Sequence, residues 1–122
     1  MAGNPICLSG AQMLAACLEQ ARVRRVYGIV GTSNIAFMNA LYDKRDRIRY
    51  VSTRHEQVAA SMADMEGRMT GRPGVCLTHS GPGTLNAVMS MANAYKDCSP
   101  LILISGKHRG HPEDARPCRL RT

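Results

Sequence analysis

A single carboxylate stands out among the residues of this sequence that could do chemistry. Three segments gather polar residues and glycines directly after short apolar runs: Gly31 to Asn34, Thr53 to Gln57, and His79 to Thr84. Glu56 is the only carboxylate in these segments. It lies near the expected start of a helix, where the helix dipole favours a negative charge. Glu56 is therefore either an ordinary first-turn residue or a catalytic acid, and spacing alone leaves both interpretations open.

The other polar residues of these segments also have two interpretations. His55 and His79 could carry protons, or they could be ordinary polar residues near the edge of a sheet. Gly81 and Gly83 could approach a ligand closely, or they could be plain turn glycines. The sequence contains neither a G-x-x-x-x-G-K-[ST] phosphate loop nor a G-x-S-x-G nucleophile elbow. The pattern by itself predicts only a ligand site of unspecified chemistry.

Alternating helix and strand signals place all three segments at one edge of a sheet. The expected strands are Val26 to Val30, Ile48 to Ser52, Val75 to Thr78 and Leu101 to Ser105. Strands separated by helices imply right-handed crossovers and parallel pairing. Ligands of open α/β sheets bind beyond the carboxyl ends of the strands. The predicted fold is therefore α/β, an open parallel sheet of four strands with helices on both faces.

Capping residues and apolar spacing predict the helices and part of the core. The expected helices open with a capping box at Ser9 and Gln12, with caps at Thr32 to Asn34, near Arg54 or His55, and at about Thr84. Gly71 is expected to end the third helix and Lys96 the fourth. Cys17 and Cys76 lie in apolar patterns and are predicted to be small core residues. The continuous apolar run Leu101 to Ser105 predicts a strand buried on both faces.

Length and charge indicate one domain that does not bind nucleic acid. The 122 residues are 44% apolar but only 4% aromatic, so aliphatic side chains must form the core. The net charge is +7, and the bases are scattered without interleaved aromatics, which favours exposed surface over nucleic-acid binding. Residues 1–106 are predicted to form the domain, and 107–122, with five basic residues, an irregular tail. His108, His111 and Cys118 resemble a metal-ligand set only loosely, so no metal site is expected.

The cysteine pattern and the N-terminal sequence indicate the cellular compartment. Five cysteines occur without a C-x-x-C pair, which disfavours a zinc ribbon or a disulfide framework and favours the reducing cytoplasm. The N-terminus lacks the basic and apolar regions of a signal peptide. No run approaches the roughly 18 apolar residues that a bilayer-spanning helix needs. We therefore expect a cytoplasmic protein without a membrane partner.

Several short strings keep a common order and spacing from about Ser9 to Gly106. They are V-Y-G-I-V-G at 26–31, R-H-E-Q-V-A-A at 54–60, S-G-P-G-T-L-N at 80–86, A-N-A-Y-K-D at 92–97 and S-P-L-I-L-I-S-G at 99–106. Each string is weak alone, but their combination is specific. Together they resemble the N-terminal pyrimidine-binding domain of thiamine-diphosphate-dependent enzymes of the acetolactate-synthase-like group.

The resemblance implies a cofactor and a role for each matching residue. The cofactor is thiamine diphosphate, whose Mg²⁺ is held by a diphosphate-binding domain or subunit through a G-D-G motif that this sequence lacks. Glu56 matches the catalytic glutamate, which hydrogen-bonds N1′ of the aminopyrimidine ring and promotes its imino form, so that the C2 proton can be removed. The implied cofactor-binding residues are Gly31, Glu56, Gly81, Pro82, Gly83 and Asn86. The implied substrate-side residues are Thr32, Ser33, Asn34, His55 and His79.

The resemblance also implies a function for the complete protein. The chain is similar to the N-terminal part of a lyase or synthase that acts on 2-oxo acids and works as a homo-oligomer. Such a domain has about six strands when complete and only four are expected here, so the chain is interpreted as truncated and inactive alone. Lys107 stands where acetolactate synthases often have Gln, which leaves the choice of 2-oxo acid open. The alternative is a non-catalytic binding module or an inactive fragment derived from such an enzyme.

Overall fold

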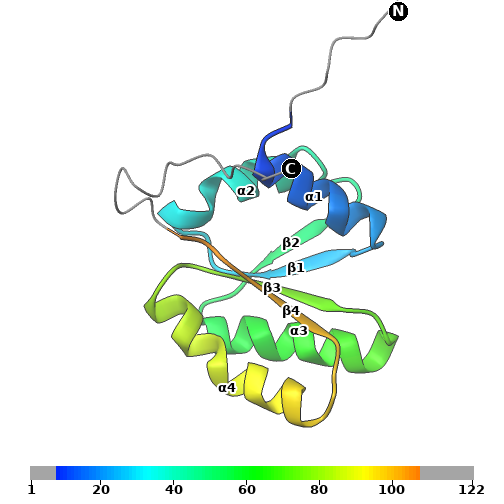
Figure 1. Ribbon diagram of the computed structural model, residues 1–122, viewed down its shortest axis with the longest axis vertical. Helices are drawn as coiled ribbons and strands as arrows, with labels where there is room; N and C mark the ends of the chain where they lie inside the picture. The colour runs from blue at the N-terminus through cyan, green and yellow to red at the C-terminus, as the bar shows by residue number, and fades with distance from the viewer. Residues whose placement is uncertain (1–7, 108–122) are drawn as a thin grey trace, which may run out of the picture.

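A four-stranded parallel sheet lies between two layers of helices in the computed structural model, which describes residues 8–107 (Figure 1). The strands are β1 (Arg25–Gly28), β2 (Arg49–Ser52), β3 (Gly74–Thr78) and β4 (Leu101–Ser105). Their order is β2-β1-β3-β4, and every pairing is parallel. The predicted fold class is confirmed. The predicted tail beyond Lys107, with His108, His111 and Cys118, lies outside the described residues.

The helices begin close to where the capping residues predict. They are α1 (Gly10–Gln20), the short 3-10 helix η1 (Thr32–Asn34), α2 (Ile35–Tyr42), α3 (Glu56–Thr70) and α4 (Pro82–Lys96). Ser9 and Gln12 form the predicted capping box of α1. Gly71 ends α3 in the left-handed conformation, with a φ of 66°. α4 begins two residues before the expected Thr84, because Pro82 occupies a first-turn position that needs no backbone N–H donor.

One core layer lies between the sheet and the helices α1 and α2. It consists of the buried residues Ala15, Leu18, Val23, Val26, Phe37, Ala40, Leu41, Ile48, Val75 and Leu77. Alternation along the strands sends Tyr27 and Cys76 to the opposite face, where α3 lies. The apolar residues that α3 contributes to that core are all alanines, at positions 59, 60 and 63, which lets the helix approach the sheet closely. α4 packs mainly against α3 (Figure 1).

Two burial predictions were wrong. Cys17 is exposed, because the buried side of α1 is formed by Ala15 and Leu18. Cys76 is fully buried, as predicted. β4 is not buried on both faces: it pairs only with β3, and Ile102 is 38% exposed. The strand with both faces buried is β3, since it lies between β1 and β4 and under both helical layers.

Candidate functional site

The three predicted segments meet at the carboxyl edge of the sheet. Parallel pairing brings the ends of β1, β2 and β3 to the same side, so that the loops after them are neighbours. Contacts between distant residues tie these loops together. A Cβ placed on Gly106, just after β4, would lie 2.4 Å from the carbonyl oxygen of Ser33, so the loop after β1 also reaches the end of β4.

Glu56 is the first residue of α3 and is buried, with 8% of its surface exposed. Its Oε2 accepts a hydrogen bond of 3.1 Å from Asn86 Nδ2 on α4. The opposite side of the carboxylate lies against Gly83, where an added Cβ would be 2.7 Å from Glu56 Oε1. The structure thus brings together Glu56, Gly83 and Asn86 from two segments that are 30 residues apart in the chain.

The buried cysteine Cys76 is the electrostatic neighbour of Glu56 on the sheet. Burial raises the pKa of the Cys76 thiol to about 12, and the charge of Glu56 contributes to the rise. Cys76 was predicted to be a core residue, but without a connection to Glu56. Alternation along β3 could have revealed the connection, because it sends Cys76 to the face that α3 covers.

Gly31 and Ser33 hold His79 at the end of β3. The Ser33 hydroxyl hydrogen-bonds His79 Nδ1 at 2.8 Å and accepts a bond of 3.1 Å from the backbone N–H of Ser80. A Cβ on Gly31 would lie 2.3 Å from His79 Nδ1, so only glycine fits between this ring and the loop. His79 also adjoins Gly83, whose added Cβ would lie 3.3 Å from the His79 Cβ.

Asn34 was predicted to cap a helix, but its side chain instead joins two loops through backbone hydrogen bonds. Its side chain makes no capping hydrogen bond to α2, the helix that it precedes. Its Oδ1 accepts from the backbone N–H of Gly31 at 2.9 Å, and its Nδ2 donates to the carbonyl oxygens of Ile29 and Thr78 at 3.1 and 3.3 Å. Asn34 is 3% exposed, so these bonds use its polar atoms to fix the loop after β1 to the end of β3.

Three of the predicted site residues mainly shape the backbone at the starts of α3 and α4: His55, Gly81 and Pro82. His55 is the exposed N-cap of α3, and its Nδ1 accepts from the backbone N–H of Gln57 at 3.2 Å. Gly81 has a φ of 69°, which favours glycine, and Pro82 starts α4 directly after it. Of the predicted substrate-side residues, Ser33 adjoins His79, while Thr32 is exposed in η1.

A match to a family model covers residues 8–116 and decides the family. The model is that of the thiamine pyrophosphate enzyme, N-terminal TPP binding domain. The chain belongs to this family. Within the thiamine pyrophosphate enzymes it is 42% identical over 100 residues to the acetolactate synthase isozyme 3 large subunit of Escherichia coli strain K12, covering 82% of this chain and 17% of that protein.

Two further relatives are named as different enzymes, a synthase and a lyase. The chain is 40% identical over 100 residues to a probable acetolactate synthase large subunit of Methanocaldococcus jannaschii, covering 82% of this chain and 17% of the relative. It is 41% identical over 106 residues to 2-hydroxyacyl-CoA lyase 1 of Mus musculus, covering 87% and 18%. The chain therefore spans less than a fifth of the length of these relatives. It corresponds to the N-terminal cofactor-binding part of thiamine pyrophosphate enzymes.

Residues 8–107 contain neither a cluster of metal ligands nor a membrane-spanning helix. Between residues 8 and 107, no three His, Cys, Asp or Glu side chains lie close enough together to hold a metal ion. Within that range, no helix combines the length and apolar character needed to span a bilayer.

Proposed function

We propose that this chain contributes the aminopyrimidine-binding half of a thiamine-diphosphate site in an enzyme that acts on 2-oxo acids. The observation that carries the proposal is the buried carboxylate of Glu56, held by Asn86 on one side and lying against a bare glycine on the other. Glu56 Oε1 receives no hydrogen bond from residues 8–107, so it is available to a ring nitrogen. The cofactor, when bound, supplies an electron sink for cleaving or forming the bond next to a carbonyl group.

The surrounding residues fit a flat heteroaromatic ring. Gly83 offers no side chain beside the carboxylate, and Gly81 has open space within 4 Å of its missing Cβ. A planar ring could therefore approach the backbone between Gly81 and Glu56. In this proposal Glu56 holds and returns a proton at the ring nitrogen, while Asn86 keeps its carboxylate in position. His79, Ser33, Thr32, Asn34 and His55 lie on the substrate side, and Gly31 is retained as a cofactor-side residue.

The diphosphate and its metal ion would be bound elsewhere. We assign the Mg²⁺ and the diphosphate to a domain or subunit that corresponds to the remaining length of the relatives. One neutral hydrogen bond contributes about 0.5–1.5 kcal/mol. Micromolar affinity corresponds to about 8 kcal/mol, so residues 1–106 alone should bind the cofactor weakly. The free thiols of Cys17, Cys76 and Cys98 are consistent with a cytoplasmic setting.

The exposed surface of α3 and α4 is apolar enough to be an interface with another chain or domain. Exposed apolar side chains gather there: Val58, Met62, Met65, Met69, Leu85, Val88, Met89 and Tyr95. Apolar patches of this kind mark protein interfaces. We propose that this face is covered in a homo-oligomeric enzyme. Met65→Glu in the chimera described below should lower its mass in solution, whereas Met13→Glu on α1 should not.

Thiamine lacking the diphosphate is the sharpest probe of the proposed site. Titrated at millimolar concentration into the ¹⁵N-labelled chain, it should shift the amide signals of Glu56, Gly81 and Gly83. Glu56→Gln should reduce these shifts, because the amide cannot exchange a proton with the ring as the acid does. Glu66→Gln, on the same helix but at its other end, is the matched control. Shifts that are absent, or that are unchanged by Glu56→Gln, would refute the role given to Glu56.

A chimera tests catalysis. Residues 8–106 would replace the matching segment of the Escherichia coli large subunit, to which this chain is 42% identical. Loss of an acid–base residue typically lowers a rate by about 100-fold to 10,000-fold. Glu56→Gln should therefore slow exchange of the cofactor's C2 proton by at least about 100-fold. A folded chimera that binds the cofactor but exchanges this proton no faster than free cofactor would instead favour a non-catalytic module.

A further inference from the structure

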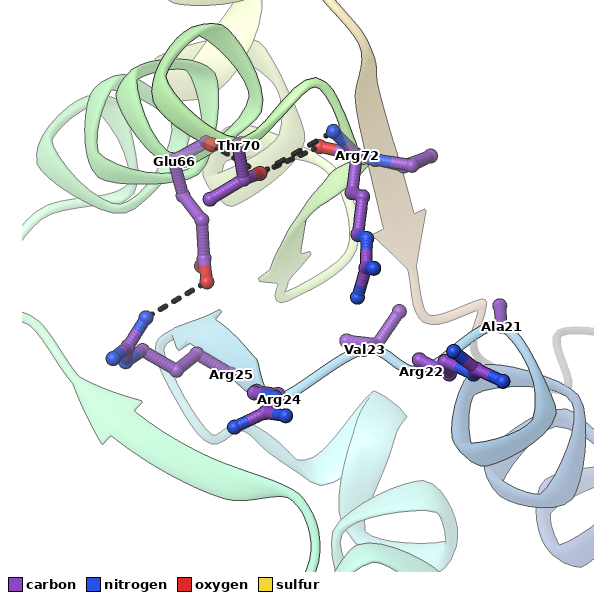
Figure 2. Close-up of a pocket in the computed structure, with 9 residues that line it drawn as sticks. Ala21, Arg22, Val23, Arg24, Arg25, Glu66, Thr70 and Arg72 are labelled. Atoms are coloured by element: carbon purple, nitrogen blue, oxygen red, sulfur yellow. Dashed lines mark hydrogen bonds and ion pairs between the residues drawn. The ribbon is translucent and has the colours of Figure 1, made fainter.

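A cavity lies at the amino edge of the sheet, on the side opposite Glu56. Its volume is about 320 Å³, and it is lined by residues 21–25 before and within β1, by Glu66 and Thr70 of α3, and by Arg72 and Pro73 before β3 (Figure 2). Glu56 and Glu66 belong to the same helix and are separated by ten residues, or about 15 Å along its axis. The cavity is therefore distinct from the proposed cofactor site.

Four arginines and one carboxylate line this cavity. The guanidinium of Arg25 is paired with Glu66, at 2.9 Å between Nη1 and Oε1. The other three, Arg22, Arg24 and Arg72, form no ion pair with residues 8–107. Figure 2 shows the Arg72 side chain extending from the β3 side toward the segment that carries the other arginines. The cavity thus has a local formal charge of +3 after the internal pair is counted.

The positive surface continues beyond the cavity. A neighbouring hollow of about 260 Å³ shares Arg22 and Arg24 and adds Arg47 and Glu19. Glu19 is already paired with both Lys44 and Arg47, so it does not neutralise the shared arginines. Clustered like charges repel each other and destabilise a fold unless a counter-charge is bound.

Arg22 also has an unfavourable backbone conformation. Its φ is 58°, in the left-handed region that normally favours glycine after a helix. The sequence thus has an arginine at the rim of the cavity where glycine would cost less. This observation agrees with a binding role for the side chain.

We propose that this cavity binds a small molecule through a diphosphate group. Guanidinium groups bind pairs of phosphate oxygens through two parallel hydrogen bonds. A diphosphate ester carries about three negative charges, which matches the three unpaired arginines. Pockets of about 300–1,000 Å³ accept small organic ligands, and this cavity lies at the lower end of that range. The group could come from inorganic diphosphate or from a nucleoside diphosphate, and both sources share this chemistry.

Calorimetric titration of the complete 122-residue chain with inorganic diphosphate, without divalent metal, tests the proposal. We expect one site with a dissociation constant of about 0.1–1 mM. Arg24→Ala and Arg72→Ala should each weaken binding about tenfold, because each removes a charge-assisted contact. The matched control is Arg54→Ala, which removes the same charge at the opposite edge. Arg24→Gln, which keeps the apolar stem, guards against a folding defect.

Separate arms of the experiment distinguish the sources and can overturn the proposal. Tighter binding of ADP than of inorganic diphosphate would identify a nucleotide as the ligand, and the reverse order would identify the inorganic ion. Amide shifts should appear at residues 22–25 and 70–72. Thiamine without phosphate should leave those signals unchanged. No binding at 10 mM (about 100 times the tighter limit expected), or an equal loss of affinity in Arg54→Ala, would overturn the proposal.

Discussion

The position of the Glu56 carboxylate depends on two uncharged neighbours. Asn86 donates to one oxygen, and Gly83 leaves space beside the other. The nearby Gly81 has a different role. Its backbone adopts a φ of 69°, which favours glycine, whereas the space around its missing Cβ is open. The two glycines are two residues apart, yet the structure predicts opposite consequences for their replacement.

Gly83→Ala should displace Glu56 with little loss of stability. The new methyl group would lie 2.7 Å from Glu56 Oε1, and a flexible carboxylate can move away from it. Gly81→Ala should instead lower the free energy of unfolding by about 1–3 kcal/mol, because a φ of 69° combined with a ψ of −117° suits glycine and strains alanine, but should leave Glu56 in place. Urea unfolding and thiamine-induced amide shifts measure the two effects. If both variants lost the same property, the separate roles of these glycines would be wrong.

At the scale of elements, α3 is held against the strands by glycines that allow backbone contact. A Cβ on Gly67 would lie 2.3 Å from the carbonyl oxygen of Pro100, and one on Gly74 would lie 1.8 Å from that of Ala63. Backbone atoms cannot rotate away as a carboxylate can. This close packing fixes the C-terminal half of α3 relative to the sheet.

Gly67→Ala should destabilise the fold by about 1–3 kcal/mol, as overpacking usually does. Alanine is favoured over glycine within helices by about 1 kcal/mol, so the clash must outweigh this gain. Gly10→Ala in α1 is the control, since no atom lies within 4 Å of its missing Cβ and only the helical preference applies. Chemical denaturation compares the two. Equal or improved stability in Gly67→Ala would show that α3 can move off Pro100 at no cost.

The elements were predicted more accurately than their environments. The run Leu101 to Ser105 matched β4 residue for residue, because a turn proline and Gly106 bound it. Its burial was wrong, since strand order decides which strand lies at an edge and crossover lengths do not reveal that order. The predicted burial of Cys17 was wrong for a related reason. More than one side of its short helix is apolar, and only packing against the sheet decides which side is buried.

The sequence singled out residues that the structure brings together, such as Glu56 and Asn86, but it did not predict the hydrogen bonds between them. Glu56 and the Gly81 to Gly83 turn were found from their motif, and the sheet edge followed from parallel topology. The contact between Asn86 and Glu56 joins two helices, and Asn34 binds backbone atoms of residues 29, 31 and 78. Such bonds depend on loop conformation that residue types do not specify. The arginine cavity was missed because Arg72 is distant in sequence from Arg22 and Arg24.

At the scale of the whole molecule, buried acidic groups make stability depend on alkaline pH. Burial raises the pKa of Tyr50 from 10.0 to about 12 and that of Cys76 from 9.0 to about 12. Burial, with the nearby Glu66, also raises the pKa of Tyr27. Each group keeps its proton in the folded state at a pH where the unfolded chain loses it. Because the folded state then binds more protons, stability must fall as the pH rises.

The free energy of unfolding should be steady between about pH 7 and 9, decline from about pH 9 as Cys76 becomes the first group to favour unfolding, and fall more steeply from pH 10 to 12. Tyr50→Phe should flatten the fall between pH 10 and 12. It should also raise stability at pH 7 by about 1 kcal/mol, because the buried Tyr50 hydroxyl has no hydrogen-bond partner in residues 8–107. Tyr95→Phe, at an exposed tyrosine, is the control and should change neither quantity. Urea unfolding at a series of pH values gives both. A Tyr50→Phe profile parallel to that of the parent would mean that this phenol ionises as readily in the folded state as in the unfolded chain.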